Sequence, residues 1–353
     1  MAKVLLIYAG FGEGHRKAAL SLQEFFNAPC RDLLEFCPPF IGKIYSFVYS
    51  VVTSYFPYLW RCIFFSTRDG PISFLVKKFQ RIIFSSFLKY LRETKPQIII
   101  ATHFFPLVLI SLLKEELNLK VISIVTDLRA HPLWVEKCVD YYFAAHSITK
   151  EDLINLGVGK EKIFTGAIPL REGFLKELSQ ARLREKFSLD AKPCLLFIFS
   201  LKGKFSFLKE SISQLINSFN VFIIYDKNKK LKKFLLGLDS RSLKHFPYYE
   251  NIWELIYLSS IIITKPGGLT VFEGLYKKKP FIFTHYIPGQ EEENMDLLIE
   301  YGVAKYAKNK EELLSAIDYF KNKSGELNSN YPIKVKDVRR TLDNLICNLI
   351  VGR

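Results

Sequence analysis

The sequence predicts an α/β protein with two Rossmann-like domains that face each other across a cleft. Two observations carry this prediction. Short aliphatic runs typical of buried parallel strands alternate with helical segments, and the alternation starts afresh in the second half of the 353-residue chain. We therefore expect a first domain over residues 1–168, a second over residues 169–334, and a last helix within residues 335–353 that packs back toward the first domain.

The first half opens as a doubly wound sheet does, with a strand, a glycine turn and a helix. An aliphatic run at residues 3–8 leads through Gly10, Gly12 and Gly14 into a helical segment at residues 15–26. Residues 166–169 read as an interdomain linker. Between the first helix and the linker, after an aromatic stretch at residues 40–91, the alternation continues. We expect strands at residues 97–102, 121–126, 141–144 and 163–164 and helices at residues 106–117 and 150–156.

The second half repeats the alternation. Because ligands in parallel sheets lie at the carboxyl ends of the strands, the residues that follow each strand are the candidate site residues. We expect strands at residues 194–199, 221–225, 261–264 and 280–284, with helices at residues 204–218, 229–236, 252–258, 269–276 and 335–350.

The stretch from residue 40 to residue 91 is helical in character and rich in aromatic side chains. It holds an uncharged run between Lys43 and Arg61, whose length is at the bottom of the ~17–25 residues that a spanning helix needs. Weakly polar side chains recur in this run at helical spacing, opposite an apolar stripe, which favours an amphipathic element at a membrane surface. A buried helical hairpin is the alternative. The stripe comprises Ile44, Val48, Val51, Tyr55 and Leu59, and Lys77, Lys78 and Arg81 follow as candidates for contact with anionic headgroups.

Composition narrows the class of partner. The net charge of +15 indicates an anionic partner: nucleic acid, an acidic membrane or a phosphorylated small molecule. No basic and aromatic strand motif of a nucleic-acid binder accompanies this charge, so we expect no nucleic acid. The six cysteines form no Cys-x-x-Cys pair, which predicts neither a zinc site nor a disulfide framework and fits a reducing compartment. No signal peptide is expected.

The strongest ligand-binding pattern is the segment 264–273, Thr-Lys-Pro-Gly-Gly-Leu-Thr-Val-Phe-Glu, which follows an expected strand and opens an expected helix. Gly267 and Gly268 let the backbone approach a ligand closely. Thr270 lies near the first helical turn, where free N–H groups favour phosphate. Glu273 can accept hydrogen bonds from both hydroxyls of a ribose. A plain glycine turn with a capping box from Thr270 to Glu273 is the alternative.

A second pattern follows the next expected strand. A Pro-Gly turn at residues 288–289 presents Gln290 and Glu291 beside the first loop. An amide and a carboxylate supply the donors and acceptors that sugar hydroxyls need. An exposed, acidic start of a helix is the alternative reading of this segment.

Histidines and an aspartate also follow expected strands. His15 comes after the first strand and its glycine turn, and an ordinary imidazole pKa of about 6.5 suits a general base near neutral pH. A contact to a diphosphate is the rival role for His15, and Asp127 is the alternative base. His103 and His131 also follow strand ends and are candidates to line an acceptor site.

These motifs together resemble glycosyltransferase family 28 over nearly the whole chain. That family contains the lipid II-forming N-acetylglucosaminyltransferase, the monogalactosyldiacylglycerol synthases and the bacterial processive diacylglycerol glucosyltransferases. The segment 264–294 is similar to the donor site of the family, and residues 12–19 resemble its glycine–histidine loop, with Phe11 and Glu13 interrupting the usual glycine run. Residues 126–134, Thr-Asp-Leu-Arg-Ala-His-Pro-Leu-Trp, and residues 166–171, Gly-Ala-Ile-Pro-Leu-Arg, resemble segments of its diacylglycerol branch.

The resemblance implies a GT-B fold and a role for each matching residue. His15 and Asp127 would be catalytic, and the diphosphate, ribose and sugar of a UDP-sugar would be held by the second domain. The implied donor-binding residues are Gly14, Arg171, Lys202, Tyr248, Tyr249, Gly267, Gly268, Leu269, Thr270, Glu273, Gln290, Glu291 and Asn294. The implied acceptor-binding residues are His103, His131, Trp134, Tyr49 and Trp60.

The implied reaction is an inverting transfer of glucose or galactose from a UDP-sugar to 1,2-diacylglycerol, by a peripheral protein at the cytoplasmic face of an anionic membrane. No Asp-x-Asp pair indicates a metal site, so we expect no metal and no cofactor. A helix N-terminus and basic side chains would stabilise the departing UDP. One segment departs from the family: residues 200–204, Ser-Leu-Lys-Gly-Lys, hold a single glycine where the family has a glycine-rich loop.

Three other functions remain open at this point. The first is N-acetylglucosaminyl transfer to a lipid-linked muramyl-pentapeptide, against which the 126–134 segment argues. The second is a UDP-sugar epimerase, which has no need of an aromatic membrane element. The third is a non-catalytic UDP-sugar sensor, which the altered 200–204 loop suggests.

Overall fold

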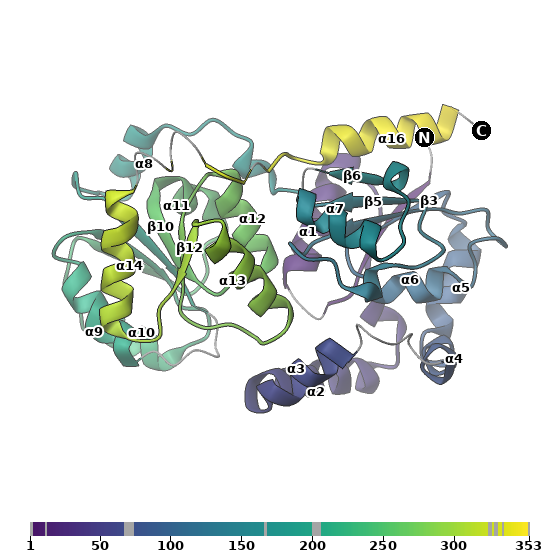
Figure 1. Cartoon of the computed structure of the whole chain (residues 1–353), viewed down its shortest axis with the longest axis horizontal. Coiled ribbons are helices and arrows are strands. Elements are labelled where there is room, and N and C mark those ends of the chain that lie inside the picture. Colours follow the sequence, from purple (N-terminus) through teal and green to yellow (C-terminus); the bar gives the residue numbers. More distant parts are fainter. Residues whose placement is uncertain are drawn as a thin grey trace. The chain divides into compact units, whose positions relative to one another are not determined.

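The computed structural model describes residues 3–10, 13–66, 74–165, 168–199, 206–323, 327, 331–333 and 335–351. The chain folds into two compact units (Figure 1). Unit 1 comprises residues 1–171 together with residues 288–290 and 335–353. Unit 2 comprises residues 172–287 and 291–334.

Unit 1 is built on a six-stranded parallel sheet in the order β2-β1-β3-β4-β5-β6. Because its strands are buried on both faces, they are nearly continuous aliphatic runs. The strands are β1 (Val4–Tyr8), β2 (Cys30–Asp32), β3 (Ile98–Ala101), β4 (Lys120–Val125), β5 (Tyr141–Ala144) and β6 (Ile163–Thr165). The helices beside them are α1 (Glu13–Phe26), α5 (Ser85–Thr94), α6 (Phe105–Ile110), α7 (Ser147–Asn155) and α16 (Arg339–Val351), with short 3-10 helices at Leu33–Phe36, Pro132–Trp134 and Lys160–Lys162.

The two faces of this sheet carry separate cores, because alternate residues of a strand point to opposite sides. One core joins Leu5 and Ile99 to Phe87 and Leu91 of α5. The other core packs against α16, which returns to unit 1 from the far end of the chain (Figure 1). It combines Leu6, Ile100 and Leu22 with Leu342, Leu345 and Ile346.

The aromatic stretch forms three further helices in unit 1: α2 (Pro39–Tyr55), α3 (Pro57–Ser66) and α4 (Phe74–Ile83). The predicted apolar stripe is on the surface, since Ile44, Val48, Tyr55 and Leu59 are all between 49% and 77% exposed. Thr53, from the predicted polar stripe, is buried instead. Figure 1 shows α2 and α3 side by side. No helix in the described part of the chain is long and apolar enough to cross a membrane.

Unit 2 repeats the architecture of unit 1. Its six parallel strands follow the order β12-β11-β10-β7-β8-β9. They are β7 (Cys194–Ile198), β8 (Asn220–Ile224), β9 (Leu243–Phe246), β10 (Ser259–Thr264), β11 (Phe281–Phe283) and β12 (Ala304–Tyr306). The helices are α8 (Gln180–Lys186), α9 (Ser206–Leu215), α10 (Lys229–Leu236), α11 (Ile252–Leu258), α12 (Gly268–Tyr276), α13 (Gln290–Glu300) and α14 (Lys310–Asn322), after a 3-10 helix at Glu172–Phe174.

The predicted α/β class with two Rossmann-like units is confirmed, and several elements differ in detail. The helix expected at residues 106–117 ends at Ile110, and residues 111–118 form turns. The hydroxyl of Ser111 donates to the carbonyl of Val108 at 2.7 Å, a local bond of the kind that competes with helix propagation. Strands β2, β9 and β12 and helices α8 and α14 were not expected, because three- or four-residue strands and half-polar helices leave weak periodicity. The helix start that was the alternative reading of residues 291–293 is present in α13, with Glu291 buried.

The strand order identifies one position in each sheet where the chain reverses its direction of winding. In unit 1, β2 lies on one side of β1 and β3 lies on the other. In unit 2, β8 lies on one side of β7 and β10 lies on the other. Loops that leave the carboxyl ends of two such neighbouring strands diverge, and this is where open α/β sheets bind ligands.

Candidate functional site

At the switch point of unit 1, two histidines and two threonines form a cluster. His15 lies in the first turn of α1, directly after the loop that follows β1. Its Nδ1 is 2.9 Å from the carbonyl oxygen of Thr102 and 2.8 Å from the hydroxyl oxygen of Thr126. The hydroxyl of Thr102 donates to the carbonyl of His15 at 2.9 Å. The carboxyl ends of β3 and β4 therefore hold the His15 ring and backbone together.

His103 stands against His15. The two imidazole rings are 4.4 Å apart between centroids and meet edge to face. The backbone N–H of Phe105 donates to Nδ1 of His103 at 3.0 Å, so Nδ1 of His103 is an unprotonated acceptor. The structure thus brings together two residues that the sequence placed after separate strands.

Both rings are held in their neutral form. Burial lowers the pKa of His15 to about 4, a shift that the bond to Thr102 only partly opposes. Burial and the charge of His15 lower the pKa of His103 well below its ordinary value. A neutral imidazole keeps one lone pair that can accept a proton at neutral pH, but a pKa of about 4 makes His15 a weaker base than the ordinary imidazole expected from the sequence.

Asp127 and Trp134 form the next layer. Asp127 follows β4 and is buried, as is Trp134 in the 3-10 helix that comes after it. The indole Nε1 of Trp134 donates to Oδ2 of Asp127 at 3.2 Å. The Trp134 ring is also 6.4 Å from the rings of both His15 and His103. Asp127 is therefore an acceptor for a side chain beside the histidine pair.

His131 joins the histidine cluster to the aromatic helices. Its Nδ1 accepts from the N–H of Leu133 at 3.2 Å, so its Nε2 donates to the carbonyl of Phe64 in α3 at 3.1 Å. The ring centroids of His131 and Phe64 are 4.6 Å apart. Trp60, also predicted to bind the acceptor, is half-buried in α3. Tyr49 lies in α2, and its side chain is not among those that the structure describes.

The loop that begins the cluster has an anchor that the sequence analysis missed. Oδ1 of Asp32 accepts from the N–H of Gly10 at 2.9 Å and from the N–H of Leu34 at 3.0 Å. A Cβ on Gly10 would collide with this carboxylate, which explains the glycine. Asp32 ends the unexpected strand β2, so only the sheet order could reveal it. Gly14 lies in the first turn of α1, and Gly12 falls outside the described residues.

At the switch point of unit 2, the loop after β10 leads into α12 as the sequence predicted. Gly267 caps the helix, and Gly268, Leu269 and Thr270 form its first turn. The unpaired N–H groups of such a turn are a ready site for a phosphate. Glu273 follows on the same helix and is 1% exposed.

Two residues predicted to read a sugar also brace this loop. The carboxylate of Glu291 accepts from the ammonium of Lys265 and, at 2.8 Å, from the N–H of Ile287. The amide of Asn294 is fully buried and donates to the carbonyl of Pro266 at 3.1 Å. Lys265 was missed as a site residue, although its place beside the two glycines was a signal in the sequence.

The remaining predicted donor residues are spread over unit 2 and the chain around it. Tyr249 donates from its hydroxyl to Oε2 of Glu254 at 2.6 Å, whereas Tyr248 is 62% exposed. Gln290 opens α13, and Arg171 is half-buried at the end of the main segment of unit 1. Lys202, with the rest of the 200–204 loop, lies outside the described residues.

His285 is a half-buried titratable group of unit 2 that the sequence analysis did not single out. It follows β11, and the Thr284 hydroxyl oxygen lies 3.1 Å from its Nδ1. Burial lowers its pKa to about 4. Among the described residues, no group of three or more His, Cys, Asp or Glu side chains is placed to hold a metal ion.

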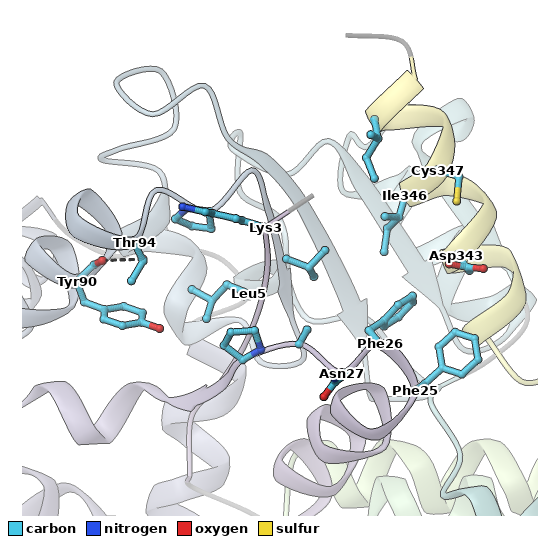
Figure 2. A pocket seen from close by; sticks show the side chains of 15 residues that line it. Lys3, Leu5, Phe25, Phe26, Asn27, Tyr90, Thr94, Asp343, Ile346 and Cys347 are labelled. Carbon is cyan, nitrogen blue, oxygen red and sulfur yellow. Dashed lines mark hydrogen bonds between the residues drawn. The ribbon is translucent and has the colours of Figure 1, made fainter. Parts of the chain in front are cut away.

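A cavity of about 680 Å³ lies at the opposite edge of the unit 1 sheet. Figure 2 shows it between Lys3 and Leu5 at the amino end of β1 and Ile346 and Cys347 of α16. Its walls are mainly apolar, and Phe25 and Phe26 from the end of α1 complete them. Because this edge carries the amino ends of the strands, the cavity is separate from the histidine cluster.

Comparisons with known proteins identify the family and the fold of the chain. The family profile described as monogalactosyldiacylglycerol (MGDG) synthase matches residues 15–170. The chain is 30% identical over 331 residues to the processive diacylglycerol beta-glucosyltransferase of Bacillus cereus strain G9842, covering 89% of this chain and 84% of that one.

Two solved structures share the fold at low sequence identity. The calicheamicin glycosyltransferase CalG4 superposes with a TM-score of 0.62 at 9% identity, covering 100% of both chains. A putative UDP-N-acetylglucosamine 2-epimerase from Listeria monocytogenes gives a TM-score of 0.62 at 13% identity, covering 100% of this chain and 98% of that one. The fold is therefore of the GT-B type, and transferases and epimerases share it.

Proposed function

Because the chain belongs to glycosyltransferase family 28, with the monogalactosyldiacylglycerol synthases and processive diacylglycerol beta-glucosyltransferases, we propose that it transfers glucose or galactose from a UDP-sugar to 1,2-diacylglycerol. The observation that carries the proposal is the neutral His15, held at the switch point of unit 1 within the segment that matches the family. Unit 1 would bind the lipid acceptor and unit 2 the UDP-sugar.

In the proposed reaction, Nε2 of His15 takes the proton of the acceptor hydroxyl. The oxygen then attacks C1 of the sugar from the face opposite to UDP, the bond from C1 to the diphosphate oxygen breaks, and the configuration at C1 inverts. Asp127 is the weaker candidate for the base, because its carboxylate already accepts from the Trp134 indole. We assign to Asp127 the orientation of Trp134 beside the acceptor.

The donor would be held by the loop after β10 and the helix it opens. Amides of Gly268, Leu269 and Thr270 suit the diphosphate, and Glu273 suits the two ribose hydroxyls. Fixed positive charge would stabilise the departing UDP, so that the transfer needs no metal ion. Lys265, Arg171 and Lys202 are the candidates to supply that charge. The sugar would be bound by Gln290, Glu291 and Asn294, and the uracil by Tyr248 and Tyr249.

Helices α2 to α4 would seat the protein on the cytoplasmic face of a membrane. Large apolar side chains on them are exposed, among them Phe47 at 69% and Tyr58 at 82%. Between Phe36 and Arg92 the only acidic residue is Asp69, while basic residues are frequent. Exposed apolar side chains on a stretch with an excess of basic residues are features that favour binding to an anionic bilayer.

The test is a transfer assay with the purified full-length chain. Vesicles containing diacylglycerol are incubated with UDP-glucose, UDP-galactose or UDP-N-acetylglucosamine, with and without EDTA. The product is identified by mass and its anomeric configuration by NMR. We expect a β-linked hexosyl diacylglycerol with either of the first two donors, unchanged by EDTA, and a loss of about 10²–10⁴-fold in kcat for His15→Gln.

Other outcomes would replace the proposal with a different function. Transfer only to a lipid-linked muramyl-pentapeptide would assign the chain to the other branch of the family. Release of UDP with a 2-epimer of the sugar would indicate an epimerase. Tight binding of a UDP-sugar without turnover on any lipid would indicate a sensor.

A further inference from the structure

We infer that the Thr102 carbonyl and the Thr126 hydroxyl are positioning groups for His15: the carbonyl holds a hydrogen on Nδ1, which leaves Nε2 basic, and the hydroxyl stabilises the ring once it is charged. The inference rests on the proposed role of His15 as the base. It goes beyond that role, because it names the groups that select the reactive form of the ring.

The carbonyl of Thr102 selects the tautomer. It lies 2.9 Å from Nδ1, and a carbonyl oxygen can only accept a hydrogen bond, so Nδ1 carries the hydrogen. Free histidine in water prefers the hydrogen on Nε2, so this contact reverses the ordinary preference. The Thr102 hydroxyl also donates to the His15 carbonyl at 2.9 Å, so the backbone and the ring of His15 are both held by the residue that follows β3. Within the described residues, Nε2 of His15 has no hydrogen-bond partner.

Thr126 supplies the second acceptor at the same nitrogen. Its hydroxyl oxygen is 2.8 Å from Nδ1, and its side chain is buried at the end of β4. Because Nδ1 carries a hydrogen, the hydroxyl oxygen of Thr126 can only accept at this nitrogen, and it shares the hydrogen with the Thr102 carbonyl. Such a bond strengthens when the donor becomes a cation, so Thr126 favours the imidazolium that forms during transfer.

No ionisable group around His15 is described as bonded to Nδ1, so the two threonines are the groups that stabilise the charged ring. On α1 itself, Glu13 and Arg16 pair with each other at 3.3 Å and are exposed. After β4, Asp127 accepts from the Trp134 indole. After β3, His103 stays neutral, because burial and a charge on His15 both lower its pKa. The described contacts to Nδ1 are therefore the two uncharged oxygens.

The proton and the electron pairs balance in this arrangement. Nε2 of His15 receives the proton of the acceptor hydroxyl, while Nδ1 keeps its hydrogen bonded to the two threonine oxygens. The acceptor oxygen forms its bond to C1 of the sugar, and the electrons of the broken C1–O bond leave with UDP. The imidazolium then returns its proton to water, which restores the starting tautomer.

The test combines NMR with kinetics on the full-length chain. Long-range ¹H–¹⁵N spectra of protein labelled with ¹⁵N-histidine report the tautomer of each ring at pH 7, and His15→Gln identifies the His15 signals. We expect a protonated Nδ1 and a bare Nε2 for His15. For Thr126→Val we expect kcat to fall about ten-fold with KM for both substrates within about two-fold, because one hydrogen bond to a charged group is lost.

The pH profile separates a positioning role from a structural one. Losing an acceptor disfavours the imidazolium, so the acid limb of kcat should move to lower pH in Thr126→Val, and Thr126→Ser should restore both the rate and the limb. Thr149→Val is the matched control: Thr149 is fully buried on α7, and its hydroxyl donates to the Leu128 carbonyl at 2.6 Å. This control should leave kcat, the acid limb and the His15 signals unchanged.

Two results would overturn the inference while leaving the proposed function intact. One is a His15 that carries its hydrogen on Nε2 in the wild type, with His15→Gln inactive. The other is Thr126→Val with wild-type kcat and acid limb. Conversely, full activity of His15→Gln would remove the proposed role of the base, whatever tautomer the spectra report.

Discussion

At the scale of single residues, neighbouring histidines are held in opposite tautomers by the backbone. Nδ1 of His15 faces a carbonyl oxygen, whereas Nδ1 of His103 faces a backbone N–H. The first ring must therefore carry hydrogen on Nδ1 and the second on Nε2. Two identical side chains, 4.4 Å apart, thus have different chemistry because the strand ends around them differ.

Glu273 is the residue whose substitution tests the proposed UDP-sugar site in unit 2. Replacing it with Gln removes the charge that would receive the two ribose hydroxyls, and hydrogen bonds to charged groups contribute about 1.5–3 kcal/mol. We expect Glu273→Gln to raise KM for the UDP-sugar at least ten-fold and to change kcat little. Steady-state kinetics with varied donor measures this. Glu300→Gln, an exposed position on α13, should match the wild type, and an unchanged KM in Glu273→Gln would exclude the ribose contact.

At the scale of elements, α2 and α3 carry several large apolar side chains on the surface, among them Phe47 and Tyr58. Nε2 of His131 donates to the carbonyl of Phe64 in α3, which joins this helix to the strand ends beside His15. The element that would meet the lipid is therefore joined by a hydrogen bond to the cluster that would act on it.

A double substitution in these helices tests the membrane surface. Phe47→Ser with Tyr58→Ser removes two exposed aromatic side chains, so the free energy of unfolding should hardly change. Binding to vesicles with anionic lipid should fall about ten-fold or more, since full burial of one such side chain contributes about 1.5–3 kcal/mol. Flotation of the protein with vesicles measures it. Leu236→Ser on α10, also exposed, is the control, and an equal loss there would contradict the assignment.

Helix α16 provides a second test at this scale. Leu342 is fully buried in the core that it shares with Leu6 and Leu22. Leu342→Ala should lower the free energy of unfolding by about 2–5 kcal/mol, because it leaves a cavity in a packed core. Leu349→Ala, at a half-buried position of the same helix, should cost clearly less. Urea denaturation compares the two, and equal losses would show that α16 does not complete this core.

At the scale of the whole molecule, histidines that the fold keeps neutral couple stability to pH. Burial lowers the pKa of His15 and of His285 to about 4 in the folded chain, and it lowers the pKa of His103 well below its ordinary value. In the unfolded chain, each ring takes a proton near pH 6.5. Between these values the unfolded state binds more protons, so stability decreases as the pH falls from about 6.5 to about 4.

Melting temperatures at pH 8.0, 7.0, 6.0 and 5.0 check this prediction. We expect little change between pH 8 and 7 and a steady decrease below pH 6.5. His285→Gln should flatten part of the decrease, because one group no longer gains a proton on unfolding. A Tm that stays constant from pH 7 to 5 would contradict the assignment of histidines with lowered pKa values.

Much of the fold could be predicted from the sequence because buried parallel strands are continuous aliphatic runs. The segments of β1, β5, α10 and α11 were expected within one residue of where they lie. The short strands β2 and β12 could not be predicted, since three residues with mixed burial leave no periodic signal. Because β2 was not predicted, Asp32 at its end was also missed, although this residue anchors the loop at Gly10.

The sequence by itself determined which residues follow strands and where a glycine turn opens a helix, and this was enough to single out His15, His103, Asp127 and Glu273 as candidates. Only the tertiary structure decided what each contacts. Strand order brings the ends of β1, β3 and β4 to one edge, so that Thr102 and Thr126 meet one nitrogen of His15. Residues up to 111 positions apart share that contact, and no local pattern records so distant a neighbour. The identity of a catalytic candidate is therefore local information, whereas its tautomer and pKa depend on the packing of the whole sheet.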